Sequence, residues 1–346
     1  MFAFLLIPAL VAGQALAPVS PFAVRYRALV DAYRTGAPDA VRSARELDLH
    51  RLDAIVDEYV GNGQRSARSP SLDADFLHAA SMLHADAAFQ CWENFGMEGC
   101  GAHLDIARRF VDVSEAPGTR GAFRRRWYAA TALILTRHVA PEAALKYFDG
   151  AIAQLPDDVP LLTAAGWFAE RLSRSAAPPN VNLRNAQELR QGHEQRAAGF
   201  LEAALAVDPR AAEASLRLAR IEVSSGKREA ALNRLAALLV RADIHKSVAY
   251  VARLTLGSLR ERDGNRIEAE RLYREAIPLD PVAQSARVAL THLLYAAGDG
   301  AGAADAIDPV LARNTPEAND AWPDYQLAYP GVGQVLLDQL RAEVRR

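Results

Sequence analysis

The chain has 346 residues, of which half are apolar and 24% are charged, and its formal net charge is −2. This apolar content is enough for a sizeable core and excludes a chain that is disordered throughout. The near balance of 40 basic and 42 acidic residues argues against a general binder of nucleic acids or anionic membranes.

The first 17 residues have the features of an export signal. Residues 2–12 are apolar, and Ala15-Leu16-Ala17 has the small-x-small pattern of a cleavage site. The apolar run is shorter than the roughly 20 residues that are needed to cross a bilayer. One feature is atypical of an export signal, since no Lys or Arg precedes the apolar run. The sequence predicts cleavage after Ala17 and a periplasmic or secreted chain without an integral membrane span. An uncleaved anchor and an ordinary first helix are the alternatives.

Residues 18–117 form the first predicted unit after the signal. Apolar residues at helical spacing predict helices over 22–34, 40–60, 72–90 and 102–113. Gly36 and the sequence Gly61-Asn62-Gly63 are typical ends of the first two helices. No long alternating stretch rich in β-branched residues occurs, so we expect no sheet.

Two cysteines, Cys91 and Cys100, lie on either side of residues 92–99, which we expect to be the loop of a helix hairpin. In an exported protein, an even and closely spaced pair predicts a disulfide. A metal site with His84 and His103 is the alternative, but this spacing of His and Cys matches no usual zinc pattern. We therefore expect no metal ion and no cofactor.

A repeat of 34 residues runs through the second half of the chain. Three pairs of like residues are 34 positions apart: Gly264 and Gly298, Ala269 and Ala303, Leu256 and Leu290. Further upstream, Ala144 recurs as Ala197, 53 positions later, which predicts an inserted loop over 175–193. Helix pairs stack in such arrays because one pair alone cannot bury its apolar face.

The best conserved copy of this pattern resembles the tetratricopeptide repeat. It contains Leu256-Gly257, Gly264, Ala269, Tyr273, Ala276 and Asp280-Pro281. The resemblance covers 118–316 clearly and 18–117 in degenerate form, and 317–346 is expected to cap the array. It implies an all-α fold, a right-handed α-solenoid of antiparallel helix pairs whose first helices line a concave groove.

The resemblance also implies which residues face the groove. By position these are Trp167, Arg171, Leu216, Arg220, Leu254, Arg262, His292 and Tyr295. Aromatic and Arg side chains are enriched at the centres of protein interfaces, so this set suits a protein or peptide partner. The alternative is that Trp167 packs in the core and that Arg220 and Arg262 are simply solvated.

No catalytic constellation is evident in the sequence. The glycine-rich stretch at 298–302 lies between two predicted helices, where a turn explains it. We therefore expect a non-enzymatic scaffold of the cell envelope or exterior that binds a protein, and not nucleic acid, in the groove. One alternative is an enzyme or small-ligand carrier with a pocket formed by the N-terminal third, with His78 and His84, and the 175–193 loop. Another is a structural member of an assembly, held through its edges.

Overall fold

The computed structural model describes residues 20–37, 39–48, 51–54, 56, 74–95, 100–113, 124, 127–131, 133–134, 141–174 and 183–312. The side chains of residues 74, 89–95, 100, 112–113, 141–142 and 183 are not included in this description. Within these ranges all regular structure is helical and no strand occurs.

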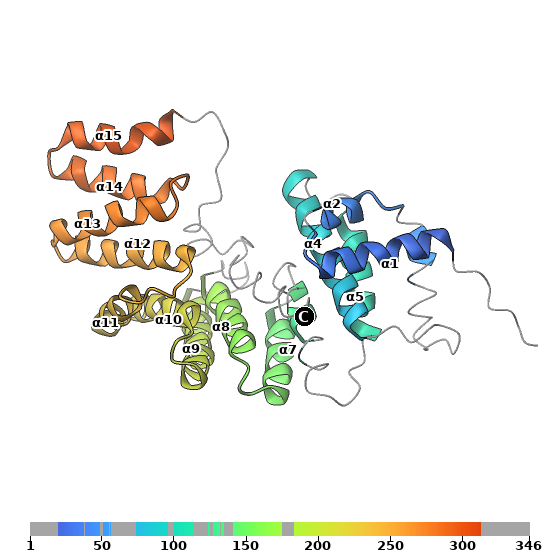
Figure 1. Ribbon diagram of the computed structural model, residues 1–346. Coiled ribbons are helices and arrows are strands. Elements are labelled where there is room, and N and C mark those ends of the chain that lie inside the picture. The colour runs from blue at the N-terminus through green and yellow to red at the C-terminus, as the bar shows by residue number, and fades with distance from the viewer. Residues whose placement is uncertain are drawn as a thin grey trace, which may run out of the picture.

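The N-terminal group consists of α1 (Pro21–Arg34), α2 (Ala40–Arg45), α4 (Ala74–Phe95) and α5 (Cys100–Val113). Helices α4 and α5 pack together as a hairpin, and α1 and α2 both pack against α4. Figure 1 shows these helices in blue and cyan at one end of the molecule. Their shared core is the start of a larger apolar cluster that continues into the repeats.

The repeat array follows as an arc of helix pairs (Figure 1). Its helices are α7 (Pro141–Gln154), α8 (Val159–Arg174), α9 (Leu183–Val207), α10 (Ala212–Ser224), α11 (Arg228–Leu239), α12 (Lys246–Arg262), α13 (Arg266–Ala276), the short 3-10 helix η1 (Ile277–Leu279), α14 (Ser285–Ala296) and α15 (Gly300–Leu311).

The packing between pairs has a regular order. The first helices contact one another in succession, α8 with α10, α10 with α12 and α12 with α14. Each second helix also contacts the first helix of the next pair. For example, α9 contacts α10 and α11 contacts α12. The first helices therefore form one continuous wall. The fold is the expected right-handed α-solenoid of antiparallel helix pairs.

The turns inside the later pairs are fixed by a glycine followed by a capping residue. Gly264 and Gly298 have φ values of 75° and 84°, in the left-handed region that favours glycine. The side chains of Asn265 and Asp299 then accept hydrogen bonds from the backbone N–H groups of Glu268 and Gly302. These bonds satisfy donors at the starts of α13 and α15, so each second helix begins at a defined residue.

A close approach between the two helices of a pair depends on Gly257. A methyl group built on its Cα would lie 2.5 Å from Cε1 of Tyr273, whose ring is buried against α12. The Tyr273 hydroxyl donates to Glu261 of α12 at 2.8 Å. Only glycine allows this ring to lie flat against the backbone of α12, so the motif positions Gly257 and Tyr273 act together.

Polar side chains tie the N-terminal helices together inside their core. The Tyr26 hydroxyl lies 3.0 Å from Nε2 of His84, and Nδ1 of His84 lies 2.9 Å from Nδ1 of His103. Burial, together with His103, lowers the pKa of His84 to about 3. His84 is therefore neutral at physiological pH, and this chain of contacts connects α1, α4 and α5.

Two sequence predictions are wrong in this region of the fold. The predicted helix over 40–60 is interrupted, because α2 ends at Arg45 and residues 46–48 are not helical, whereas the described residues 51–54 are helical again. The Asp48 side chain accepts from the backbone N–H of Arg51 at 3.4 Å and so starts the new helix. The predicted loop over 175–193 is helical from Leu183, which begins α9, and residues 175–182 lie outside the described ranges.

Several other predictions fall on residues whose structure is not described. Cys91 lies within α4 and Cys100 begins α5, but their side chains are not described, so the disulfide stays a prediction. Helix α4 continues to Phe95, which shortens the predicted 92–99 loop. The export signal at 1–17 and the cap at 317–346 also lie outside the described ranges. Among the described helices, none combines the length and apolarity needed to cross a membrane.

The contact at Gly257 gives a stability prediction. We expect Gly257→Ala to lower the free energy of unfolding by about 2 kcal/mol, because the new methyl group overpacks a buried ring. Gly150→Ala is the matched control, since nothing lies within 4 Å of a Cβ at that exposed helical position. It should leave stability unchanged or raise it by up to about 1 kcal/mol. Urea denaturation followed by circular dichroism measures both, and equal effects would contradict the proposed close approach.

Candidate functional site

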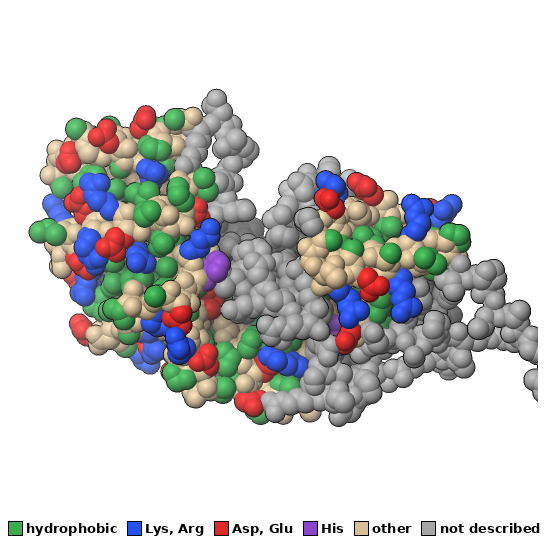
Figure 2. Space-filling view, viewed as in Figure 1, with side chains coloured by type: hydrophobic (Ala, Val, Ile, Leu, Met, Phe, Trp, Pro, Cys, Tyr) green, Lys and Arg blue, Asp and Glu red, His purple; other side chains and the backbone are tan. Residues whose placement is uncertain are grey.

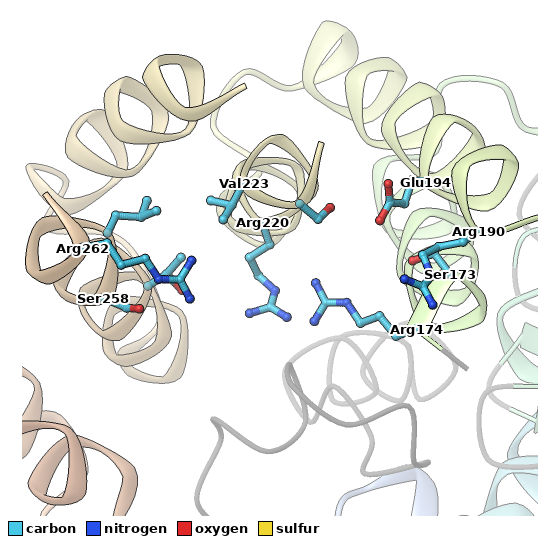
Figure 3. Close-up of a pocket in the computed structure, with 11 residues that line it drawn as sticks. Ser173, Arg174, Arg190, Glu194, Arg220, Val223, Ser258 and Arg262 are labelled. Atoms are coloured by element: carbon cyan, nitrogen blue, oxygen red, sulfur yellow. The ribbon is translucent and has the colours of Figure 1, made fainter. Parts of the chain in front are cut away.

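A pocket of about 560 Å³ opens between four helices of the array. Figure 3 shows the side chains that line it, which come from α8, α9, α10 and α12. The lining residues are Ser173, Arg174, Arg190, Glu194, Arg220, Val223, Ser224, Thr255, Ser258, Leu259 and Arg262.

The pocket lies at the C-terminal ends of three first helices. Arg174, Ser224 and Arg262 are the last residues of α8, α10 and α12. These helices run in the same direction, so their ends are neighbours along one wall. The C-terminal end of a helix carries a partial negative charge, which favours Arg there. The first half of α9 supplies the remaining wall through Arg190 and Glu194, which are one helical turn apart.

Arginine is the dominant charged residue of the pocket. Four lining residues are Arg and one is Glu, so the lining carries a net charge of +3. Figure 3 shows the guanidinium groups of Arg174, Arg220 and Arg262 pointing into the same space from three different helices. The convergence of like charges means that the pocket is suited to an anionic group.

A buried carboxylate holds two of these arginines in place. Glu170 accepts from Nε of Arg220 at 3.1 Å and from Nη1 of Arg217 at 2.9 Å, and it pairs with Nη2 of Arg174 at 2.7 Å. Arg217 also pairs with Glu213 at 2.7 Å. The cluster contains three Arg and two Glu, so its net charge is +1. It links α8 to α10 below the floor of the pocket.

Burial and charge have opposite effects on the groups in this cluster. Burial alone would raise the pKa of Glu170, but the nearby guanidinium groups of Arg220, Arg174 and Arg217 outweigh it and lower that pKa. Burial lowers the pKa of Arg220 to about 10. Both groups are therefore ionised at neutral pH, and the positive charge of Arg220 is held at the pocket by a fixed counter-charge.

Arg190 and Arg262 differ from the other two pocket arginines. Both are exposed, and neither forms a hydrogen bond or ion pair with any residue in the described part of the chain. A guanidinium group binds a carboxylate or phosphate through two parallel hydrogen bonds. These two side chains are therefore available to an anionic ligand without the loss of an existing ion pair.

The predicted groove residues divide into those at the pocket and those in the core. Arg220 and Arg262 line the pocket, and their role in binding a partner stays a prediction. Trp167, Leu216 and Leu254 do not face a groove, because they are almost completely buried. Trp167 packs beneath the guanidinium of Arg217, whose Cζ lies 5.6 Å from the ring centroid. The alternative of a core position for Trp167 is therefore correct.

The other predicted residues lie away from the pocket. Arg171 is half-buried on α8, and burial lowers its pKa. His292 and Tyr295 are exposed on α14, where Nδ1 of His292 lies 3.1 Å from Glu261. Their roles in binding stay predictions.

The pocket also bears on the alternative of an enzyme or carrier. His78 and His84 are completely buried between N-terminal helices and do not line it. In the described part of the chain, no group of three or more His, Cys, Asp or Glu residues could hold a metal ion. The observed pocket is formed by repeats, and the 183–193 stretch contributes to it as helix and not as loop.

Sequence reasoning missed Arg174, Arg190 and Glu194. The signal for the last two is present, since residues 183–191 contain neither Gly nor Pro and support a helix. The prolines at 178 and 179 led to the prediction of a longer loop. Arg174 is placed by the end of α8, a boundary that sequence patterns define poorly.

The Glu170 cluster gives a second stability prediction. Glu170→Gln should lower the free energy of unfolding by about 3 kcal/mol, because it leaves buried guanidinium groups without their counter-charge. Glu188→Gln on α9 is the control, since its ion pair with Arg184 is exposed and should contribute less than about 1 kcal/mol. Urea denaturation of both variants tests this, and a loss at Glu170 no larger than at Glu188 would contradict it.

Comparison with protein families identifies one segment of the chain. Residues 188–246 match the family model described as tetratricopeptide repeat. The match covers most of α9 together with α10 and α11, and it includes Arg190, Glu194 and Arg220 of the pocket. No curated protein sequence matches the chain.

Solved structures with a similar fold share little sequence with this chain. The MamA protein of Desulfovibrio magneticus, from residue 41 to its end, is 21% identical with a TM-score of 0.41, over 55% of this chain and 93% of that one. A thermophilic tetratricopeptide-repeat protein of Thermus thermophilus is 20% identical with a TM-score of 0.45, over 62% and 99%. The human IFIT1 dimer with m7Gppp-AAAA is 13% identical with a TM-score of 0.47, over 83% and 67%. The match identifies residues 188–246 as tetratricopeptide repeat, and the helix pairs on either side of this segment continue the same stacked arrangement.

Proposed function

We propose that this chain is a non-enzymatic scaffold that binds a protein or peptide partner along the wall formed by α8, α10 and α12. The observation that carries the proposal is the arginine pocket, which is formed by side chains of three consecutive repeats. Arrays of stacked helix pairs present extended concave surfaces, and these surfaces serve for binding. Arg is also among the residues that contribute most to protein interfaces.

The polar groups in the pocket support binding and not turnover. The hydroxyls of Ser173, Ser224 and Thr255 donate to backbone carbonyls one turn earlier in their own helices. Their protons are therefore already engaged, and their remaining acceptor sites add polarity to the wall. A nucleophile would instead need a neighbouring base that accepts its proton.

Charge outside the pocket favours a protein over a nucleic acid. In Figure 2 the Lys and Arg side chains on the repeats are interspersed with Asp and Glu. Nucleic acids bind to continuous basic surfaces that contact many phosphates. The pocket instead gathers four Arg with a single Glu on a chain whose net charge is −2, which suits a short acidic element of a protein.

We expect the mature chain to act in the periplasm or outside the cell, on the basis of residues 1–17. Mass spectrometry of the chain purified from its native host should find an N-terminus at Pro18. The apolar stretch and the Ala15-Leu16-Ala17 pattern are the reasons for this expectation. A chain recovered from the cytoplasm that retains residues 1–17 would contradict it.

The binding proposal is tested by photo-crosslinking in the native host. A crosslinking amino acid at Ser258, inside the pocket, should give adducts of higher mass that resist nuclease and are removed by protease. The same group at Ile267, exposed on α13 outside the pocket, is the control. Adding Arg190→Glu and Arg262→Glu should reduce the Ser258 adducts about tenfold, since an interface Arg contributes about 1–2 kcal/mol.

Other outcomes of this experiment would count against a protein partner. Adducts that disappear with nuclease would indicate a nucleic acid in the pocket. Equal yields from Ser258 and Ile267, or yields unchanged by the two Arg substitutions, would show that the pocket does not select its partner.

A further inference from the structure

We propose that residues 314–340 of this same chain bind in the arginine pocket, in place of the cap on the last repeat that the sequence pattern predicts for 317–346, so that the chain occupies its own binding wall until a partner displaces that segment. The proposal uses the pocket of the proposed function, but it requires no partner. It is argued from charge, from composition and from the length of chain that follows α15.

The charge of the segment is opposite to that of the pocket. Residues 314–340 contain four acidic side chains, Glu317, Asp320, Asp324 and Asp338, and no Lys, Arg or His. The segment therefore carries a charge of −4, while the pocket lining carries +3. The nearest basic residues in the sequence, Arg313 and Arg341, lie just outside its two ends.

Two arginines of the pocket are available to these carboxylates. Arg190 and Arg262 are exposed and have no hydrogen-bond or ion-pair partner in the part of the chain that the structure describes. They lie on α9 and α12, on different sides of the fixed pair Arg174 and Arg220 (Figure 3). Carboxylates at several positions along one segment can pair with guanidinium groups presented by separate helices.

The aromatic residues of the segment add a second kind of contact. Trp322 precedes Asp324 by two positions, Tyr325 follows it directly, and Tyr329 comes four positions after Tyr325. A guanidinium group stacks on the faces of Trp and Tyr as well as pairing with carboxylates. A segment that alternates acidic and aromatic side chains therefore complements a wall of arginines better than acidic residues alone would.

The connection from α15 is long enough to reach the pocket. Helix α15 ends at Leu311, and α13 and α14 lie between it and α12. From α15 to α12 there are three helix-to-helix steps of 8–10 Å, or about 30 Å in total. The pocket lies at the far end of α12, which adds about 25 Å at right angles to these steps. The direct distance from the end of α15 to the pocket is therefore about 40 Å. An extended chain from Leu311 to Asp324 covers about 43 Å. The tether also gives the segment an effective concentration in the millimolar range, which compensates for weak individual contacts.

The proposal is tested by hydrogen exchange on the full chain, followed by mass spectrometry at low salt. In the wild type, peptides from 314–340 should exchange about tenfold more slowly than an unprotected chain. Arg190→Glu with Arg262→Glu should abolish this protection, and so should Asp320→Arg with Asp324→Arg. The four substitutions together exchange the charges and should restore protection, which a simple loss of structure would not do.

Two controls separate docking in the pocket from other causes. Arg184→Glu with Arg274→Glu makes the same change of charge at exposed positions outside the pocket and should leave protection unchanged. A crosslinker at Ser258 in the purified chain should attach to residues 314–340. Mixing isotopically heavy and light chains should give adducts only within one chain.

Three results would overturn the proposal. Exchange of 314–340 in the wild type at the rate of an unprotected chain would show that the segment does not bind. Protection that survives the Arg190 and Arg262 substitutions would place it elsewhere. Adducts between heavy and light chains would show that a second copy, and not the same chain, supplies the acidic segment. Adducts with a partner protein, which test the proposed function, are measured in a separate experiment. Either proposal can therefore fail while the other holds.

Discussion

Each helix pair in this protein has an apolar surface that it cannot cover by itself, and every other property of the structure depends on how that surface is covered. The first helices α8, α10, α12 and α14 pack on one another in succession, and the second helices fill the spaces between them. Small residues make this possible, since alanines and the glycines Gly166 and Gly257 let neighbouring helices approach closely. The ends of the first helices are thereby aligned, and side chains from three repeats reach one pocket.

The electrostatics of the pocket depend on charges that are not themselves accessible. Glu170 and Glu213 are buried with Arg217, which is the largest fully buried side chain of the chain's described part. Glu170 fixes Arg174 and Arg220 at the pocket by ion pairs, while Glu213 pairs with Arg217. An isolated group of arginines would repel and turn toward solvent, whereas the buried carboxylate of Glu170 keeps two of them in position. The exposed Arg190 and Arg262 complete the site and remain free of such ties to the described residues.

The repeats could be predicted from the sequence because their turns have strong local signals. Gly264-Asn265 and Gly298-Asp299 combine a left-handed residue with a helix cap, and both turns are present as expected. The site was predicted only in part. Helical position places Trp167, Leu216 and Leu254 on the inner side, but it cannot show that neighbouring helices bury them. Whether an inward residue lines a groove or a core is decided by the packing distance between repeats, which depends on residues far away in the sequence.

The early helices were harder to predict for a related reason. The break after Arg45 depends on a single capping residue, Asp48, within a stretch whose apolar pattern continues. The helical start of α9 follows two prolines and lies in an insertion without a counterpart in the other repeats. In both places the local signal is short, and the tertiary contacts of α4 and α8 determine the outcome.

Helix α10 belongs to both apolar clusters of the molecule. Leu218 and Ile221 pack into the cluster that extends back to α1, while Leu216 and Ala219 pack into the one that extends forward to α15. The two apolar clusters therefore meet at this helix. Because α10 also carries Arg217 and Arg220, which bind Glu170 of α8, buried ion pairs lie at the place where the clusters meet. Separation of α8 from α10 would thus expose buried charges as well as apolar surface.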